Sequence, residues 1–291
     1  MGRTSTFGIA LGLLSYGLFC VHDAGVKWLV VTTPVWQILF CRSLTVLIGT
    51  LIIGRSSLLN QAVATPLKRR LVERALLMMT AWLCFYSASR TLPLGQLTTL
   101  YFVAPLLTTL LAARLLGEHV TRARWTAVSI GFVGVLFASD PFGVTASVPT
   151  LLVLAAAGMW AYGIILMRRI ARQETSLLQM LFSNTVFTII SGFASIATWR
   201  SPVGIELPLL LAVGVFGGLA QFTVFEAARS VAASVLATVE YSALVWAFLL
   251  GFAIWGDIPD LPVAIGAALI AGAGVLLVVT ERRTLERQPR K

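Results

Sequence analysis

Apolar side chains fill stretches of about twenty residues that alternate with short polar connections along the chain. A helix rises about 1.5 Å per residue, so each stretch is long enough to cross a hydrocarbon layer of roughly 30 Å. Lipid cannot satisfy an open backbone, and such spans are therefore expected to be helical. The predicted spans are 6–27, 34–53, 72–91, 94–116, 123–140, 149–168, 176–198, 207–228, 231–254 and 262–280. This pattern predicts an all-α membrane protein with ten transmembrane helices.

Lys and Arg are distributed unevenly among the connections. One set of alternate connections, taken with both termini, holds 18 of the 22 basic residues. The other set holds the three residues Lys27, Arg90 and Arg200, and Arg42 lies within a span. Because basic residues accumulate in cytoplasmic loops, we expect a multi-pass protein of a bacterial-type inner (plasma) membrane with both termini in the cytoplasm.

Composition excludes several classes of protein. With 58% hydrophobic and 12% charged residues and a mean hydropathy of +0.89, the chain is unlike a soluble domain. The net charge of +10 lies in short connections rather than on one polar face, so no nucleic-acid partner is predicted. Cys20, Cys41 and Cys84 lie within spans without metal-ligand spacing, so neither a metal nor a cofactor is predicted. The expected partners are a small-molecule substrate and membrane lipid, for a monomer or weak homodimer. The first apolar stretch is expected to be a retained helix because it is long and lacks a small-residue cleavage site.

The second half of the chain repeats the first at an offset of about 140 residues. Gly117-Glu118 matches Gly256-Asp257, and Gly134-Val135-Leu136 matches Gly274-Val275-Leu276. Each half contains an odd number of predicted helices, so the second copy must enter the membrane in the opposite sense. The sequence therefore predicts two inverted five-helix repeats with the substrate held between them near mid-membrane.

The order and doubling of several features resemble the EamA-type members of the drug/metabolite transporter superfamily, and most closely the YddG-type amino acid exporters. The residues that carry the resemblance are Ala88, Arg90 and Pro93 in a tight outer turn, Pro105, Leu116-Gly117-Glu118, Trp125 and the glycine-rich fifth span. The resemblance covers about residues 7–140 and 149–280, giving repeats at 1–145 and 146–291. It implies a secondary exporter of amino acids, with aromatic or neutral ones as candidates, or of similar small metabolites, working by alternating access. The second half departs from the pattern at Leu244 and Asp257, which match Pro105 and Glu118.

Glu240 lies at the centre of the ninth predicted span, where a charge costs about 2.5–3.5 kcal/mol on insertion scales. A carboxylate at that depth can carry protons or bind the ammonium group of a substrate. Alternatively, it is a static, hydrogen-bonded packing residue. The repeat matches Glu240 to Tyr101, which is also expected to face the centre, and this favours the functional hypothesis.

Aromatic and polar side chains are expected at a similar depth. Aromatic walls suit small amphipathic solutes because they offer apolar contact and cation–π attraction. For any one of these rings, packing or an interfacial position is the commoner explanation, so the prediction concerns the set. The candidate substrate-binding residues are Trp82, Tyr86, Tyr101, Trp160, Gln221, Glu240 and Tyr241.

His22 and Asp23 lie near the outer end of the first span, and Arg42 lies in the outer half of the second. An ion pair between Asp23 and Arg42 would offset the insertion cost of both charges. We expect these three residues, with Glu240, to take part in gating or proton coupling, or else to form a permanent structural pair. Glu118 is expected to be a solvated acid beside a helix-capping glycine.

Other functions are less consistent with the sequence. A drug, nucleobase or nucleotide-sugar carrier of the same superfamily is the main alternative, although anionic substrates call for an intramembrane basic cluster and only Arg42 is predicted inside a span. Catalytic residues are not predicted, because His22 and His119 form no His-x-x-x-His pair. No nucleotide-binding loop is present, which argues against ATP hydrolysis by this chain, and no ring of charges suggests a pore.

Overall fold

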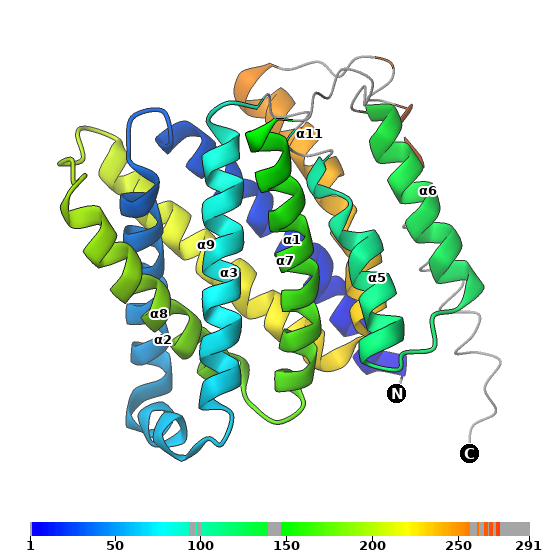
Figure 1. Cartoon of the computed structure of the whole chain (residues 1–291), viewed down its shortest axis with the longest axis horizontal. Helices are drawn as coiled ribbons and strands as arrows, with labels where there is room; N and C mark the ends of the chain where they lie inside the picture. The colour runs from blue at the N-terminus through cyan, green and yellow to red at the C-terminus, as the bar shows by residue number, and fades with distance from the viewer. Residues whose placement is uncertain are drawn as a thin grey trace.

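The computed structural model describes residues 2–92, 97, 100–138, 147–256, 261, 265–266, 268–269 and 272–273, and every regular element in these ranges is helical (Figure 1). The helices are α1 (Gly2–Leu29), α2 (Val35–Ala64), α3 (Lys68–Ser89), α5 (Ala104–Leu115), α6 (Arg122–Ala138), α7 (Val148–Ala171), α8 (Ser176–Ile196), α9 (Glu206–Ser230), α10 (Ala233–Glu240) and α11 (Ser242–Trp255). Most of the predicted span 262–280 lies outside the described residues.

Seven helical stretches among the described residues are long and apolar enough to cross a membrane. They comprise α1, α2, α3, α7, α8, α9 and the combined run of α10 and α11, and α5 is a shorter apolar helix. Large apolar side chains on their outer faces remain exposed, including Ile52, Ile53 and Phe193. An exposed apolar surface of this kind suits contact with lipid rather than with water.

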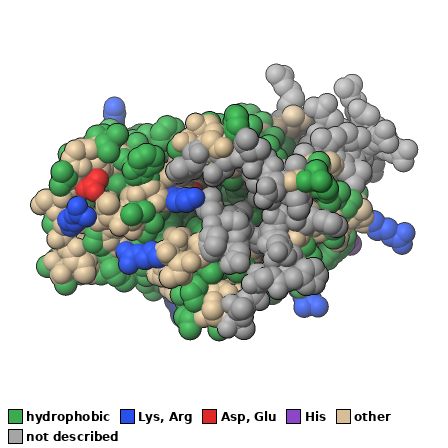
Figure 2. Space-filling model, turned by 90° about the horizontal axis from the view of Figure 1, so that it is seen from above, with side chains coloured by type: hydrophobic (Ala, Val, Ile, Leu, Met, Phe, Trp, Pro, Cys, Tyr) green, Lys and Arg blue, Asp and Glu red, His purple; other side chains and the backbone are tan. Residues whose placement is uncertain are grey.

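The two halves of the chain are packed against each other along most of their length. The most extensive interfaces join α1 with α9, α2 with α8 and α3 with α7. The connections at 30–34 and 197–205 lie at the upper end of Figure 1, and those at 65–67, 116–121 and 172–175 lie at the lower end. Seen from above, the upper end carries isolated Lys and Arg side chains among hydrophobic ones (Figure 2).

α2 is longer than the predicted span 34–53 because it bends instead of ending. Arg55 has a left-handed backbone conformation (φ 51°, ψ −156°), and helix resumes directly after it. Leu58 folds back over Gly54 and is 2% exposed. A Cβ on Gly54 would lie 2.4 Å from the Leu58 side chain, so the bend depends on the absence of a side chain at that position.

Within the described residues, the predicted spans 94–116 and 231–254 are not single regular helices, although 233–254 as a whole is long and apolar enough to cross a membrane. A turn at 102–103 precedes α5, and Tyr241 separates α10 from α11. Val103 (φ −66°, ψ −20°) and Tyr241 (φ −60°, ψ −21°) have the tightened dihedrals of a 3₁₀ turn. Pro105 explains the first interruption, because proline lacks an N–H and clashes with the preceding helical turn. The second has no proline.

Candidate functional site

A cavity of about 200 Å³ lies between α1, α3, α7, α10 and α11, and side chains from both halves of the chain line it. Its wall extends from Asp23, whose side chain is half exposed, to Glu240, which is 2% exposed. Lys27 and Ser89 also line it near the upper ends of their helices. The cavity therefore connects the upper end of the molecule with a buried carboxylate.

Three buried polar atoms converge at the inner end of this cavity. The hydroxyl of Tyr16 and the indole N–H of Trp160 lie close enough to the Glu240 carboxylate to interact with it. Even so, Tyr16 Oη, Trp160 Nε1 and Glu240 Oε2 form no well-oriented hydrogen bond with any described residue. Buried polar groups are normally paired. This inner end of the cavity is therefore suited to a ligand that supplies both a hydrogen-bond donor and an acceptor.

Aromatic rings from α1, α3, α7 and the segment that precedes α5 form the wall beside Glu240. Trp82 and Tyr86 lie 5.4 Å apart between ring centroids, and Tyr101 lies 6.5 Å from Trp160. Phe19 was not among the predicted residues, yet its ring lies 6.0 Å from Trp160 and 6.3 Å from Trp82. The structure thus places Trp82, Tyr86, Tyr101, Trp160 and Glu240 around one cavity.

Two of the predicted substrate-binding residues lie elsewhere. Tyr241 is 1% exposed and stacks on Phe102, and its hydroxyl donates to the carbonyl of Val128 at 3.3 Å, so it packs behind the cavity. Gln221 lines a separate cavity and accepts a hydrogen bond from Asn184 at 3.1 Å. Neither residue is part of the wall around Glu240.

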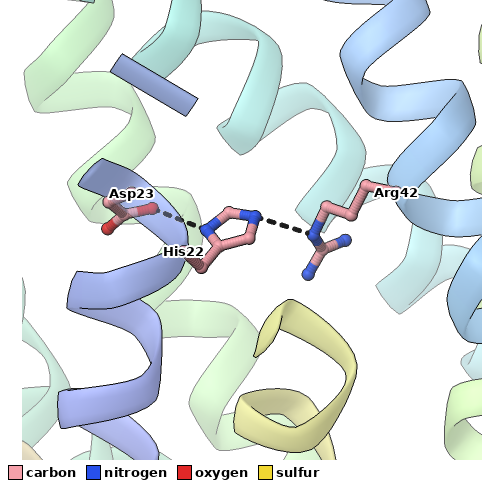
Figure 3. Close-up of polar contacts among 3 residues, drawn as sticks. All are labelled: His22, Asp23 and Arg42. Atoms are coloured by element: carbon pink, nitrogen blue, oxygen red, sulfur yellow. Dashed lines mark hydrogen bonds and ion pairs between the residues drawn. The ribbon is translucent and has the colours of Figure 1, made fainter. Parts of the chain in front are cut away.

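His22 lies between Asp23 and Arg42, so the predicted direct ion pair of Asp23 with Arg42 is wrong (Figure 3). Arg42 Nε donates to His22 Nε2 at 3.1 Å, and His22 Nδ1 lies 2.9 Å from Asp23 Oδ1. Because Nε2 accepts, the ring proton belongs on Nδ1, where it is donated to the carboxylate. The His22 imidazole therefore links the half-exposed carboxylate of Asp23 to the Arg42 guanidinium, which is 2% exposed.

The close approach of α9 holds the contacts among Asp23, His22 and Arg42 in place. A Cβ on Gly217 of α9 would lie 2.8 Å from His22 Cδ2 and 2.9 Å from Arg42 Nε. On its other side, the Arg42 guanidinium lies over the Trp82 ring, 4.1 Å from the centroid. This stacking connects the His22 contacts directly to the wall of the cavity.

Arg74 is a second buried arginine besides Arg42, and it lies on one of the helices long and apolar enough to cross a membrane. It lies on α3, is 5% exposed and donates to the carbonyl of Gly163 and to Ser183. The sequence contained a signal, because Arg74, Met78 and Trp82 are spaced four residues apart and so share one helix face. Arg74 follows closely after Lys68, Arg69 and Arg70, so in the sequence it resembles one more residue of a basic connection.

Glu118 is also more than a solvated acid, contrary to expectation. Its carboxylate accepts hydrogen bonds from the backbone N–H groups of Ala233 and Ser234 at 3.0 and 3.2 Å, and from the Ser234 hydroxyl at 3.1 Å. It therefore caps the N-terminus of α10, the short helix that ends at Glu240. The expected capping role of Gly117 is consistent with its φ of 63°, and the matching Gly256 has a φ of 71°.

In a comparison with known families, both halves of the chain match the model of one family. The model of the EamA-like transporter family matches residues 6–139 and 148–280. One solved crystal structure of another protein superposes with a TM-score of 0.77, covering 98% of this chain and 99% of that chain at 18% identity. At that identity the likeness shows the fold alone.

Characterised relatives are transporters of different small molecules. An S-adenosylmethionine uptake transporter of Rickettsia bellii is 25% identical over 290 residues, covering 98% of both chains. A pseudopaline exporter of Pseudomonas aeruginosa is 28% identical, covering 94% of this chain and 93% of its own. A riboflavin transporter of Vibrio cholerae is 25% identical, covering 80% of this chain and 78% of its own.

Proposed function

Because the chain belongs to the EamA-like transporter family, we propose that it is a secondary transporter exporting amino acids or similar small amphipathic metabolites that carry an ammonium group. Family members and relatives are small-molecule transporters rather than enzymes. The amino acid as substrate and the outward direction are the specific parts of this proposal.

The observation that carries the proposal is the Glu240 carboxylate at the end of an aromatic cavity, where its Oε2 has no hydrogen-bond partner among the described residues. An ammonium group would donate hydrogen bonds to Glu240 and lie against the rings of Trp82, Tyr101 and Trp160. The volume of about 200 Å³ is below the roughly 300–1,000 Å³ of drug-sized ligand sites, which favours a small metabolite.

The arrangement of the two ends supports alternating access. The cavity reaches residues at the upper end, whereas contacts between the two halves close the lower end. Arg169 of the second half donates to the carbonyl of Leu115 in the first half at 2.5 Å, and Glu118 of the first half caps α10 in the second. In the proposed topology, with cytoplasmic termini and inverted repeats, this is the outward-facing state of a protein in the inner membrane.

A carrier for larger flat heteroaromatic solutes is the second candidate. The aromatic wall would stack against such rings, and the relatives include transporters of riboflavin and S-adenosylmethionine, both of which contain flat ring systems. These relatives also include both uptake and export proteins. Direction and substrate therefore need to be measured together.

Purified protein in liposomes, assayed against a panel of labelled amino acids with and without a pH gradient, tests the proposal. We expect transport of one or more amino acids, and we expect Glu240→Gln and Trp160→Ala to reduce it without loss of protein. Glu73→Gln and Trp199→Ala are matched controls because both side chains are exposed away from the cavity. Full activity of both cavity variants would remove the site assignment, and transport of riboflavin but of no amino acid would favour the second candidate.

A further inference from the structure

A second, smaller cavity lies next to the one that contains Glu240. Its volume is about 30 Å³, and its lining includes Arg42, Arg74, Ser183 and Gln221. Phe19, Trp82 and Trp160 line both cavities and so form a shared aromatic partition. The buried carboxylate of Glu240 lies on one side of this partition, and the buried guanidinium groups of Arg42 and Arg74 lie on the other.

The positive charges at the smaller cavity are incompletely compensated within the described part of the chain. Arg74 makes two long hydrogen bonds, at 3.4 Å to the carbonyl of Gly163 and at 3.3 Å to Ser183, and it lies 4.7 Å over the Phe225 ring. No carboxylate among the described residues forms a salt bridge with it. Arg42 reaches Asp23 only through His22.

Several hydrogen-bond donors remain available at the cavity. A guanidinium has five N–H donors, but described residues accept one hydrogen bond from Arg42 and two from Arg74. Gln221 uses its carbonyl oxygen to accept from Asn184, and its own N–H groups have no acceptor in the described ranges. Unused donors beside two desolvated positive charges are the features of an anion site.

We propose that Arg42, Arg74 and Gln221 form a binding site for a small anionic group, and that this group is the carboxylate of the transported solute. This extends the proposed function, since a solute with its ammonium group at Glu240 and its carboxylate at the arginines would span both cavities. The Trp82 indole, stacked on Arg42, separates the two cavities in the present state. Its displacement would join them. A free anion such as chloride would accept hydrogen bonds from the same donors. The experiment must therefore distinguish the carboxylate of the solute from a free anion.

The first test measures binding of anions to purified full-length protein and is independent of transport. Melting temperature is compared in chloride, acetate and gluconate salts of sodium, gluconate being too large for a cavity of about 30 Å³. Chloride and acetate are expected to raise the melting temperature of the wild-type protein in a dose-dependent way. The rise should be reduced in Arg74→Gln and Arg42→Gln but retained in Arg69→Gln, whose side chain is 91% exposed. Equal melting temperatures of the wild-type protein in all three salts would overturn the proposal without requiring any variant to fold.

The second test compares transport of L-phenylalanine with that of phenethylamine, which has the same ring and amine but no carboxylate. Arg74→Gln is expected to reduce phenylalanine transport about tenfold or more, the loss expected when a charged hydrogen-bonding partner is removed, and to spare phenethylamine. Arg74→Lys, which retains the charge, should recover part of the activity. Equal losses for both solutes, together with anion-dependent stabilisation, would identify a free anion as the occupant and overturn the carboxylate assignment. If the wild-type protein transports no amino acid of the labelled panel while anions still stabilise it, the proposed function fails and the anion site stands.

Discussion

Phe102 and Tyr241 stack with their ring centroids 5.7 Å apart and their planes inclined by only 13°. The offset of about 140 residues that relates the two halves makes these positions equivalent, and both lie where a central helix tightens. The stacked pair therefore joins matching points of the two repeats, next to Tyr101 and Glu240. It fixes the position of the segment that carries Tyr101 relative to α10, which carries Glu240, and both residues line the cavity.

A side chain at position 131, where the chain has glycine, should disturb the stacked pair of Phe102 and Tyr241. A Cβ at Gly131 of α6 would lie 2.8 Å from the Tyr241 ring, so Gly131→Ala forces the ring to shift. We expect a loss of stability of about 1–3 kcal/mol, as is typical of overpacking, measured as a lower melting temperature in detergent. Gly158→Ala is the matched control, because a Cβ there would have no heavy atom within 4 Å. An unchanged melting temperature for Gly131→Ala would contradict this account of the packing.

Replacing His22 with alanine should destabilise the protein through Arg42. The guanidinium would lose its single hydrogen-bond acceptor among the described residues while remaining 2% exposed. An unsatisfied buried donor costs about 1–3 kcal/mol, which thermal unfolding in detergent would detect. Asp23→Asn preserves the acceptor for His22 Nδ1 and should lose much less stability, since Asp23 is half exposed. Equal losses for the two variants would indicate that the chain of contacts does not depend on the imidazole.

Glu118→Gln should loosen the attachment of α10 to the first half of the chain. The variant loses the negative charge at the helix N-terminus and one of the two carboxylate oxygens that accept from Ala233 and Ser234. The expected loss is about 0.5–2 kcal/mol, as for other N-cap residues. Glu73→Gln, which removes an exposed pair with Arg69, should change stability by less than about 0.5 kcal/mol. Equal melting temperatures for the two variants would argue against a capping role.

Cysteine labelling in intact cells can determine the topology. In a background lacking the native cysteines, Arg200→Cys is expected to react with a membrane-impermeant reagent from outside. Arg172→Cys and a cysteine placed at Arg3 should react only after permeabilisation, because basic residues accumulate in cytoplasmic loops. External labelling at both positions 3 and 172 would reverse the predicted orientation, whereas external labelling at only one of them would contradict the predicted order of spans and, with it, the inverted arrangement of the repeats.

Most helix positions could be predicted from the sequence because a span across lipid leaves a long, continuous apolar signal. The interruptions were harder to foresee. Tyr241 tightens one turn without any proline, and Gly54 and Arg55 bend α2 within a run of helix-compatible residues. The first feature accompanies a contact with Phe102, far away in the sequence, and the second accompanies a local contact of Leu58 with Gly54 that no hydrophobic pattern reveals.

The candidate site could be predicted only for residues whose chemistry is unusual in a membrane. Glu240 and Arg42 are charges in the middle of apolar stretches, and both are buried in the structure. Phe19 resembles any other membrane phenylalanine, and its role follows from packing against Trp82 and Trp160. Glu118 lies at a helix end where an acid is unremarkable, and its partners are more than a hundred positions away in sequence.

The bend at Arg55 has a consequence for how the molecule sits in its bilayer. As a straight rod, the thirty residues of α2 would extend about 45 Å, well beyond a hydrocarbon layer of roughly 30 Å. After the bend, the segment carries both exposed apolar residues, Leu59 and Val63, and exposed polar ones, Asn60 and Gln61. This mixture suits the headgroup region, where Arg55 can reach phosphate. A bent segment held in that region would set the depth of α2 in the bilayer and, with it, the depth of Arg42.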